Sequence, residues 1–204
     1  FYFDGGDFLV ADGRVFVTPD VVKRNVPLVV ADRAALADEL SAAVGRPVVL
    51  LDDAPPHHAG MFMMSAGNRT MLVGDPSLAQ PLVDAAAAPF PFDFTAATQA
   101  KFDAVARQCA AEGLTVLRLP VVPGADGRTY ITSLNAIVDH RDGRRVVYMP
   151  AFTGFEAVNE QAAAVWRRAG AHVVPIDCTS SYRHYGNLRC LVNVMARGEV
   201  APRL

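Results

Sequence analysis

The feature that most constrains the fold of this chain is a unit of secondary structure that recurs along the sequence. The unit is a hairpin, then a helix, then a strand. The alternation of apolar residues predicts three hairpins, over residues 7–18, 61–73 and 131–148. Each contains a dipeptide suited to a tight turn: Asp12-Gly13, Gly67-Asn68 and Asp142-Gly143. Recurrence of one unit predicts a repeat architecture in which each unit buries its helix against its own strands.

The spacing of apolar residues also predicts the helix and the closing strand of each unit. The expected helices run from Asp32, as the N-cap, to a stop at Gly45, from Thr95 to Ala111, and from about Phe155 to Arg168. Short apolar runs predict the closing strands at residues 48–51, 115–122 and 172–176. A glycine-containing turn before Cys190 predicts that this thiol stands at the start of a further strand, which would open a fourth unit.

Composition and charge exclude several classes of function. The chain has 204 residues, of which 51% are hydrophobic, and it is expected to form a single domain over residues 1–204. A formal net charge of −2 without a basic run argues against a nucleic-acid partner or an anionic membrane surface. Charged residues or prolines interrupt every apolar segment before it reaches bilayer length. Phosphate-loop and dinucleotide-binding motifs are absent.

The cysteines bear on the compartment and on the chemistry. Cys109, Cys178 and Cys190 form an odd set without metal-like spacing, which favours free thiols in a reducing, cytoplasmic compartment. A thiol becomes a useful nucleophile when a neighbouring group lowers its pKa or removes its proton. His58 is the candidate for that role beside Cys190, whereas His57 is interpreted as a solvated loop residue. The histidines and cysteines show no spacing typical of a zinc site.

Three stretches in chain order carry a resemblance to a known family. They are Phe3-Asp4-Gly5-Gly6-Asp7-Phe8, His58-Ala59-Gly60-Met61-Phe62-Met63 and Gly186-Asn187-Leu188-Arg189-Cys190. Together they resemble the catalytic signatures of the guanidine-modifying, or pentein, superfamily. This superfamily comprises arginine, agmatine and peptidylarginine deiminases, dimethylarginine hydrolases and amidinotransferases. The resemblance extends over essentially the whole chain.

The resemblance implies an α/β fold, a pentein-like propeller of repeated ββαβ units around a central channel. A complete member carries five units, whereas this chain holds about three and part of another, and a unit before Asp4 is missing from the sequence. The propeller is therefore expected to be incomplete at the N-terminus. The expected partners are a separate chain that supplies the missing unit, or further copies of this chain in a homo-oligomer. The alternative from repetition alone is a three-layer α/β domain of mixed strands without a channel.

The resemblance also implies a mechanism that uses no metal and no organic cofactor. Cys190 would attack the guanidine carbon to form a covalent amidino-thioether. His58 would protonate the leaving amine and then activate water, while Asp4 would accept the His58 N–H and fix its orientation. The positive charge of Arg189 would help to hold the thiolate. The expected substrate is a small guanidine or an arginine side chain.

Three further residues of this family comparison concern substrate binding. Asp7 and Asn135, together with Arg189, are assigned to the substrate-binding surface, and Tyr130 is placed with Asn135 on the channel floor. Gly60 is the main departure, since family members usually carry Asp at this position. Without that carboxylate, tight capture of a free guanidinium is not expected.

Gly60 and the missing unit leave a catalytically inactive binding module open. An amidinotransferase, which Phe3-Asp4 and Asp7 favour, and a cysteine-dependent amide hydrolase that uses Cys190 and His58 are further alternatives to a deiminase.

Overall fold

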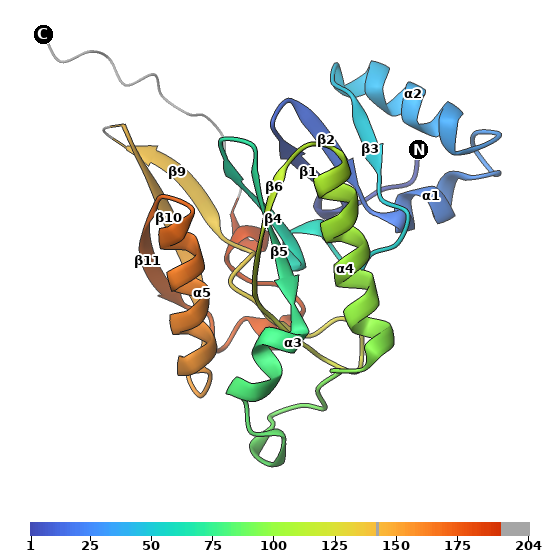
Figure 1. Cartoon of the computed structure of the whole chain (residues 1–204). Helices are drawn as coiled ribbons and strands as arrows, with labels where there is room; N and C mark the ends of the chain where they lie inside the picture. Colours follow the sequence, from blue (N-terminus) through green and yellow to red (C-terminus); the bar gives the residue numbers. More distant parts are fainter. Residues whose placement is uncertain (142, 193–204) are drawn as a thin grey trace, which may run out of the picture.

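The computed structural model describes residues 1–141 and 143–192 and has a mixed α/β fold (Figure 1). Within these residues, three sheets share one topology, in which the first strand is antiparallel to the second and the second is parallel to the third. The sheets are β1 (Phe8–Ala11), β2 (Arg14–Val17) and β3 (Val48–Leu50); β4 (Met63–Gly67), β5 (Thr70–Asp75) and β6 (Thr115–Pro120); and β9 (Ile137–Arg141), β10 (Arg144–Ala151) and β11 (Ala171–Asp177). The predicted repetition of one supersecondary unit is confirmed.

A helical crossover joins the second and third strands of each sheet, as a parallel pair requires. The main crossover helices are α2 (Arg33–Val44), α4 (Ala96–Ala111) and α5 (Glu156–Arg168), which lie close to the predicted ranges. Two shorter helices were not predicted, α1 (Pro19–Asn25) and α3 (Pro76–Ala79), and each begins with a proline, a residue that suits the first helical position. A small antiparallel pair of β7 (Val122–Pro123) and β8 (Tyr130–Ile131) follows the second unit.

Local signals in the sequence set several of these boundaries. Asp12 and Gly13 have φ angles of 49° and 80°, as the predicted tight turn between β1 and β2 requires. Asp32 accepts a hydrogen bond of 2.9 Å from the Ala35 N–H and so caps α2. Gly45 ends the same helix in the left-handed conformation, with a φ of 65°.

Two of the predicted hairpins differ from the structure in detail. The second turns one residue later than expected, at Asn68 and Arg69, because the register shifts between Ser65 and Gly67 in a bulge-like irregularity. The third begins at Ile137 and not at Ile131, because residues 130–131 pair with β7 instead. Its predicted turn residue Asp142 lies outside the described residues.

The expected strand at Cys190 was wrong for the residues that the structure describes. Leu188–Leu191 form a 3-10 helix, in which the Cys190 N–H donates to the Asn187 carbonyl at 3.1 Å. The apolar residues that favoured a strand do not form ladder hydrogen bonds here, because the chain turns on itself immediately before Cys190. The rest of the predicted strand, from Asn193 onward, lies outside the described residues.

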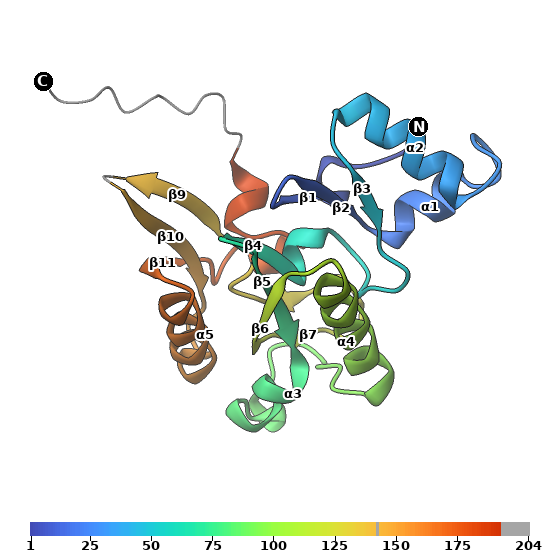
Figure 2. The same cartoon turned by 45° about the horizontal axis from the view of Figure 1, so that its top comes forward.

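The first strands of the three sheets converge on one cavity. Residues of β1, β4 and β9 line it, and in Figure 2 these strands face the middle of the molecule while α2, α4 and α5 lie outside. Each of these first strands is an edge of its own three-stranded sheet, and the described sheets do not join into one closed barrel. Closure into a propeller around a channel therefore stays a prediction.

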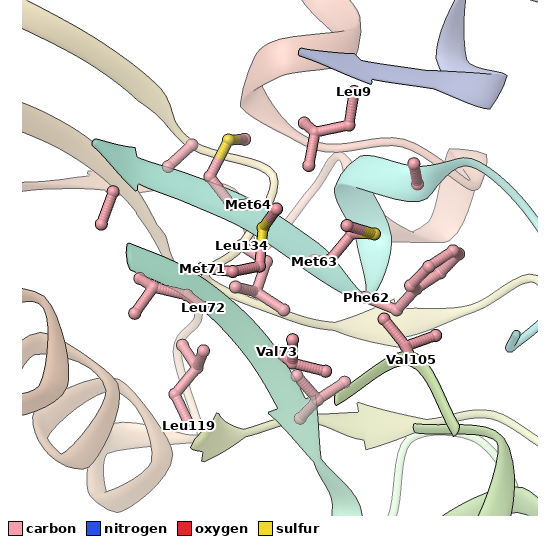
Figure 3. Close-up of a cluster of buried hydrophobic side chains, with 14 of the residues drawn as sticks. Leu9, Phe62, Met63, Met64, Met71, Leu72, Val73, Val105, Leu119 and Leu134 are labelled. Atoms are coloured by element: carbon pink, nitrogen blue, oxygen red, sulfur yellow. The ribbon is translucent and has the colours of Figure 1, made fainter. Parts of the chain in front are cut away.

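One hydrophobic core joins the units beneath this cavity. Figure 3 shows Leu9 of β1 in the same cluster as side chains of β4 and β5 and Val105 of α4. The cluster continues to Trp166 of α5, whose side chain is completely buried. Helix α5 packs against β6 as well as against its own sheet, so it connects the second and third units. Among the described residues, no helix combines the length and apolar character needed to cross a membrane.

We predict that Gly74→Ala destabilises the fold. A Cβ at this position of β5 would lie 2.7 Å from Cε1 of Phe102 and 2.8 Å from Cγ2 of Val121, both core side chains. Overpacking of this kind costs about 1–3 kcal/mol. Urea unfolding should therefore show a lower midpoint, whereas Gly5→Ala, whose Cβ meets no heavy atom within 4 Å, serves as the control. An unchanged midpoint for Gly74→Ala would contradict this packing.

Candidate active site

A cavity of about 800 Å³ brings together five of the six residues that the sequence assigned to the site. They come from four segments that are distant in the sequence. Asp4 precedes a 3-10 helix, Gly5–Asp7, and His58 precedes another, Ala59–Met61. The others are Asn135, between β8 and β9, and the consecutive residues Arg189 and Cys190.

The Asp4 carboxylate lies beside His58. Oδ1 of Asp4 is 3.3 Å from Nε2 of His58 and also accepts the Gly6 N–H at 3.0 Å. The hydrogen bond from Gly6 lowers the pKa of Asp4, and the positive charge that His58 can carry lowers it further. Asp4 is therefore ionised at neutral pH and is placed to orient the imidazole.

The His58 ring packs directly on the backbone of Gly6. A Cβ at Gly6 would lie 2.2 Å from Cγ of His58, a separation that the two groups cannot adopt. The His57 ring also contacts the His58 ring, and the two ring centroids are 4.5 Å apart. Glycine is thus required at residue 6 by the close approach of an aromatic ring, and this approach helps to fix the imidazole beside Asp4.

His58 and Cys190 form a hydrogen bond that changes the pKa of both groups. The bond to Cys190 raises the pKa of His58 against the effect of burial, and Asp4 adds to the rise. Burial acts to raise the pKa of the Cys190 thiol, but hydrogen bonds from His58, from the Asn187 N–H and from Asn135 outweigh it, so this pKa is lowered. The two shifts together favour a thiolate–imidazolium pair.

Asn135 holds the backbone that carries the thiol. Its side chain is 1% exposed, and its Oδ1 accepts the N–H groups of Arg189 and Cys190 at 3.0 and 3.3 Å. Its side chain also hydrogen-bonds the Cys190 thiol.

Tyr130, which was expected beside Asn135, does not line the cavity. Its side chain is buried, and its hydroxyl donates to the carbonyl of Pro56, the residue just before the His57–His58 pair, at 3.0 Å.

Arg189 places a positive charge in the cavity wall. Its Nη1 lies 3.6 Å from Sδ of Met64, and burial lowers the pKa of its guanidinium. No carboxylate in the described part of the chain forms an ion pair with it. A Cβ at Gly60, the position without the expected carboxylate, would lie 3.8 Å from this Nη1 and 3.2 Å from Nδ2 of Asn135. This side of the cavity is therefore cationic.

Asp7 does not reach the cavity, so its position gives no support to the predicted contact with substrate. Its side chain is 2% exposed and accepts hydrogen bonds from the Thr18 hydroxyl at 2.9 Å, from Arg24 at 3.1 Å and from the Asp4 N–H at 2.8 Å. The chain turns at Gly5–Gly6, which directs Asp7 inward while Asp4 faces the cavity. Asp7 braces the helix that presents Asp4.

Cys190 differs from the other two cysteines in exposure and in acidity. Cys190 is exposed, whereas Cys109 and Cys178 are buried. Burial raises the pKa of Cys109 to about 12, so this thiol is inert at neutral pH.

Within residues 1–141 and 143–192, no group of three His, Cys, Asp or Glu side chains could hold a metal ion.

Sequence reasoning interpreted His57 as a solvated loop residue and missed its contact with the loop of Cys190. Its Nε2 lies 2.5 Å from the carbonyl oxygen of Tyr185, in the loop before Cys190. The only signal in the sequence was its place beside His58. Its partner is 128 residues away along the chain, so no local pattern contains this contact.

Comparison with known proteins assigns the fold. No family model and no curated protein sequence matches the chain. Among solved structures, an agmatine deiminase from C. jejuni matches 92% of this chain over 54% of its own length, with 14% identity and a TM-score of 0.66. This chain has a pentein fold. A putative arginine deiminase from Porphyromonas gingivalis matches with 18% identity and a TM-score of 0.63, over 92% of this chain and 55% of its own.

An amidinotransferase from Microseira wollei shares the pentein fold at greater distance. It is 14% identical, with a TM-score of 0.54, and the match covers 97% of this chain and 46% of the other. The chain thus spans about half the length of these enzymes. At sequence identities this low, the structural match establishes the common fold, and the activity has to be argued from the site.

We predict that Gly6→Ala displaces the His58 ring and weakens its bond to Cys190. The thiol pKa should then rise by about one unit, which slows alkylation of Cys190 by iodoacetamide at pH 7 about tenfold. The rate is measured by peptide mass mapping. Gly5→Ala is the matched control, because its Cβ meets no heavy atom within 4 Å. Equal rates for the two variants would show that the ring does not depend on Gly6.

Proposed function

We propose that the protein hydrolyses a carbon–nitrogen bond of a guanidine or amidine, as a deiminase does, through a covalent intermediate on Cys190. The observation that carries this proposal is the contact of His58 with both the Asp4 carboxylate and the Cys190 thiol at one cavity. An acid/base, an orienting carboxylate and a thiol of lowered pKa are the groups that such a reaction needs. The pentein fold shared with agmatine and arginine deiminases supports the same reaction class.

In the first half of the proposed reaction, the Cys190 thiolate attacks the guanidine carbon. The His58 imidazolium gives its proton to a nitrogen of the substrate as the carbon–nitrogen bond breaks, so an amine leaves. The product is an amidino-thioether, and His58 is left neutral. The Asp4 carboxylate keeps the ring oriented and favours its charged form before this step.

In the second half, water takes the place of the amine. Neutral His58 accepts a proton from the water while the water oxygen bonds to the thioether carbon. The carbon–sulfur bond then breaks and returns the thiolate, which Arg189 stabilises by its positive charge. The substrate leaves as a ureido compound, and no metal or organic cofactor takes part.

The electrostatics of the cavity limit how a substrate is captured. Asp4 supplies the negative charge on the His58 side, whereas Gly60 supplies none and Arg189 is cationic. We therefore expect weak binding of a bare guanidinium by this chain alone. A small guanidine or an arginine side chain remains the proposed substrate class.

An amidinotransferase is the second candidate, and a second cavity favours it. This cavity, of about 490 Å³, is lined by His58 and Cys190 together with Tyr185 and His184. The thiol therefore borders two spaces, and an acceptor amine in one could resolve an intermediate formed in the other. Partition of product between water and added amine distinguishes the two reactions.

We predict a covalent adduct on Cys190 during turnover. Acid quenching of the protein with arginine, agmatine or guanidinoacetate should give an intact mass increased by the transferred amidino group. Cys190→Ala should give no adduct, and Cys109→Ala should retain it because Cys109 is completely buried. A panel that produces no adduct on the wild type would favour an inactive binding module.

The pH dependence follows from the directions of the two pKa shifts. The reactive form needs Cys190 ionised and His58 protonated. The rate should therefore rise through a thiol pKa below its ordinary value and fall through an imidazole pKa above its ordinary value. We predict that Asp4→Asn moves the descending limb to lower pH, because the carboxylate raises the pKa of His58.

The size of this Asp4→Asn effect is limited by solvent. The Asp4 side chain is 61% exposed, so we expect a loss of about tenfold in kcat/KM at neutral pH, less than removal of a buried orienting acid causes. Rates between pH 5 and 10 measure both limbs. A descending limb that stays in place would show that Asp4 does not act on His58.

A further inference from the structure

Two strained residues flank the site outside any hairpin turn. Five non-glycine residues in the described part of the chain have positive φ angles, and three of them lie in the β1–β2 and β4–β5 turns. The other two are His57, with a φ of 82°, and Tyr185, with a φ of 62°. Such conformations are uncommon for these residue types and persist where surrounding contacts hold them. His57 precedes His58 directly, and Tyr185 stands in the loop that leads to Cys190.

A hydrogen bond joins these two residues. Nε2 of His57 lies 2.5 Å from the Tyr185 carbonyl oxygen, across 128 residues of sequence. A carbonyl can only accept, so Nε2 of His57 carries the proton. Burial lowers the pKa of His57, with the charges of His58 and Arg128 acting in the same direction and the bond to Tyr185 and the Asp4 carboxylate opposing them. The ring is therefore neutral at pH 7 and protonated on Nε2.

The backbone that His57 holds lies directly against the thiol. Tyr185 ends the 3-10 helix Tyr182–His184, and Gly186 follows it. A Cβ at Gly186 would lie 3.2 Å from Cβ of Cys190 and 3.6 Å from its Sγ. Fixing the Tyr185 carbonyl therefore fixes the segment on which the Cys190 side chain rests.

The same imidazole contacts the acid/base. The His57 and His58 rings have centroids 4.5 Å apart and are tilted by 45°. The His58 ring is thus held by Gly6, by Asp4 and by His57. His57 thus contacts both the His58 ring and, through Tyr185, the segment packed on Cys190.

We propose that His57 is a positioning residue that clamps the loop of Cys190 to the loop of His58 and so maintains the hydrogen bond between thiol and imidazole. Its backbone conformation is the strained element, and the bond to Tyr185 is what holds it. The role rests on the proposed function only in treating His58 and Cys190 as a working pair. The proposal predicts that the acidity of the Cys190 thiol depends on the His57 side chain, which does not hydrogen-bond the thiol itself.

The test compares His57→Gly and His57→Asn with the wild type in the full chain. Glycine relieves the positive φ and removes the imidazole, whereas asparagine tolerates positive φ and retains an N–H donor. The readout is the pH profile of Cys190 alkylation by iodoacetamide, followed by peptide mass mapping, with the thermal midpoint measured beside it. His172→Ala is the control, because His172 is an exposed histidine of β11 that lines neither cavity.

We expect His57→Gly to raise the midpoint of the alkylation profile by about one pH unit, a tenfold slower reaction at pH 7, without lowering the thermal midpoint. His57→Asn should fall between it and the wild type, and His172→Ala should match the wild type. A lower thermal midpoint with an unchanged alkylation profile would show a purely structural role and overturn the proposal. Alkylation needs no turnover, so failure of guanidine hydrolysis would leave this result intact.

Discussion

The hydrogen bond between His58 and Cys190 is the interaction on which the proposed chemistry of this chain depends. It joins two loops that are far apart in the sequence, and it shifts the pKa values of both groups toward a charged pair. A free thiol is a poor nucleophile at neutral pH because most of it is protonated. Asp4 and Gly6, from a third segment, hold the His58 ring, and Asn135 holds the backbone of Cys190, so the surrounding structure keeps this contact in place.

The site is built where the edges of three similar sheets converge. β1, β4 and β9 each contribute residues to the cavity, while the crossover helices pack on the outside. Because the units share one core, the loops at the ends of their strands are held at fixed separations. The buried Asp7 carboxylate beneath the site accepts hydrogen bonds from three protein partners. Such bracing leaves Asp4 free to face the cavity.

The charge distribution is what sets this site apart from the pattern that its motifs resemble. Gly60 leaves one wall without a carboxylate, and Arg189 places a cation close to the same point. A cation beside the thiol favours the thiolate but disfavours a guanidinium that approaches without a counter-charge. Under the proposed function, the same arrangement supports Cys190 as the nucleophile and weakens the capture of a guanidinium substrate. This conflict makes the identity of the substrate the central functional question for the chain.

The sequence by itself determined the repeated unit, because tight-turn dipeptides, helix caps and apolar spacing are local signals: Asp12-Gly13, Asp32 and Gly45 acted as predicted. The order of its motifs also pointed to Asp4, His58 and Cys190. Only the tertiary structure decided which side chains meet. It turned Asp7 inward, placed Cys190 in a 3-10 helix and joined His57 to Tyr185, since these outcomes depend on contacts between distant segments and on backbone conformations that no local pattern encodes.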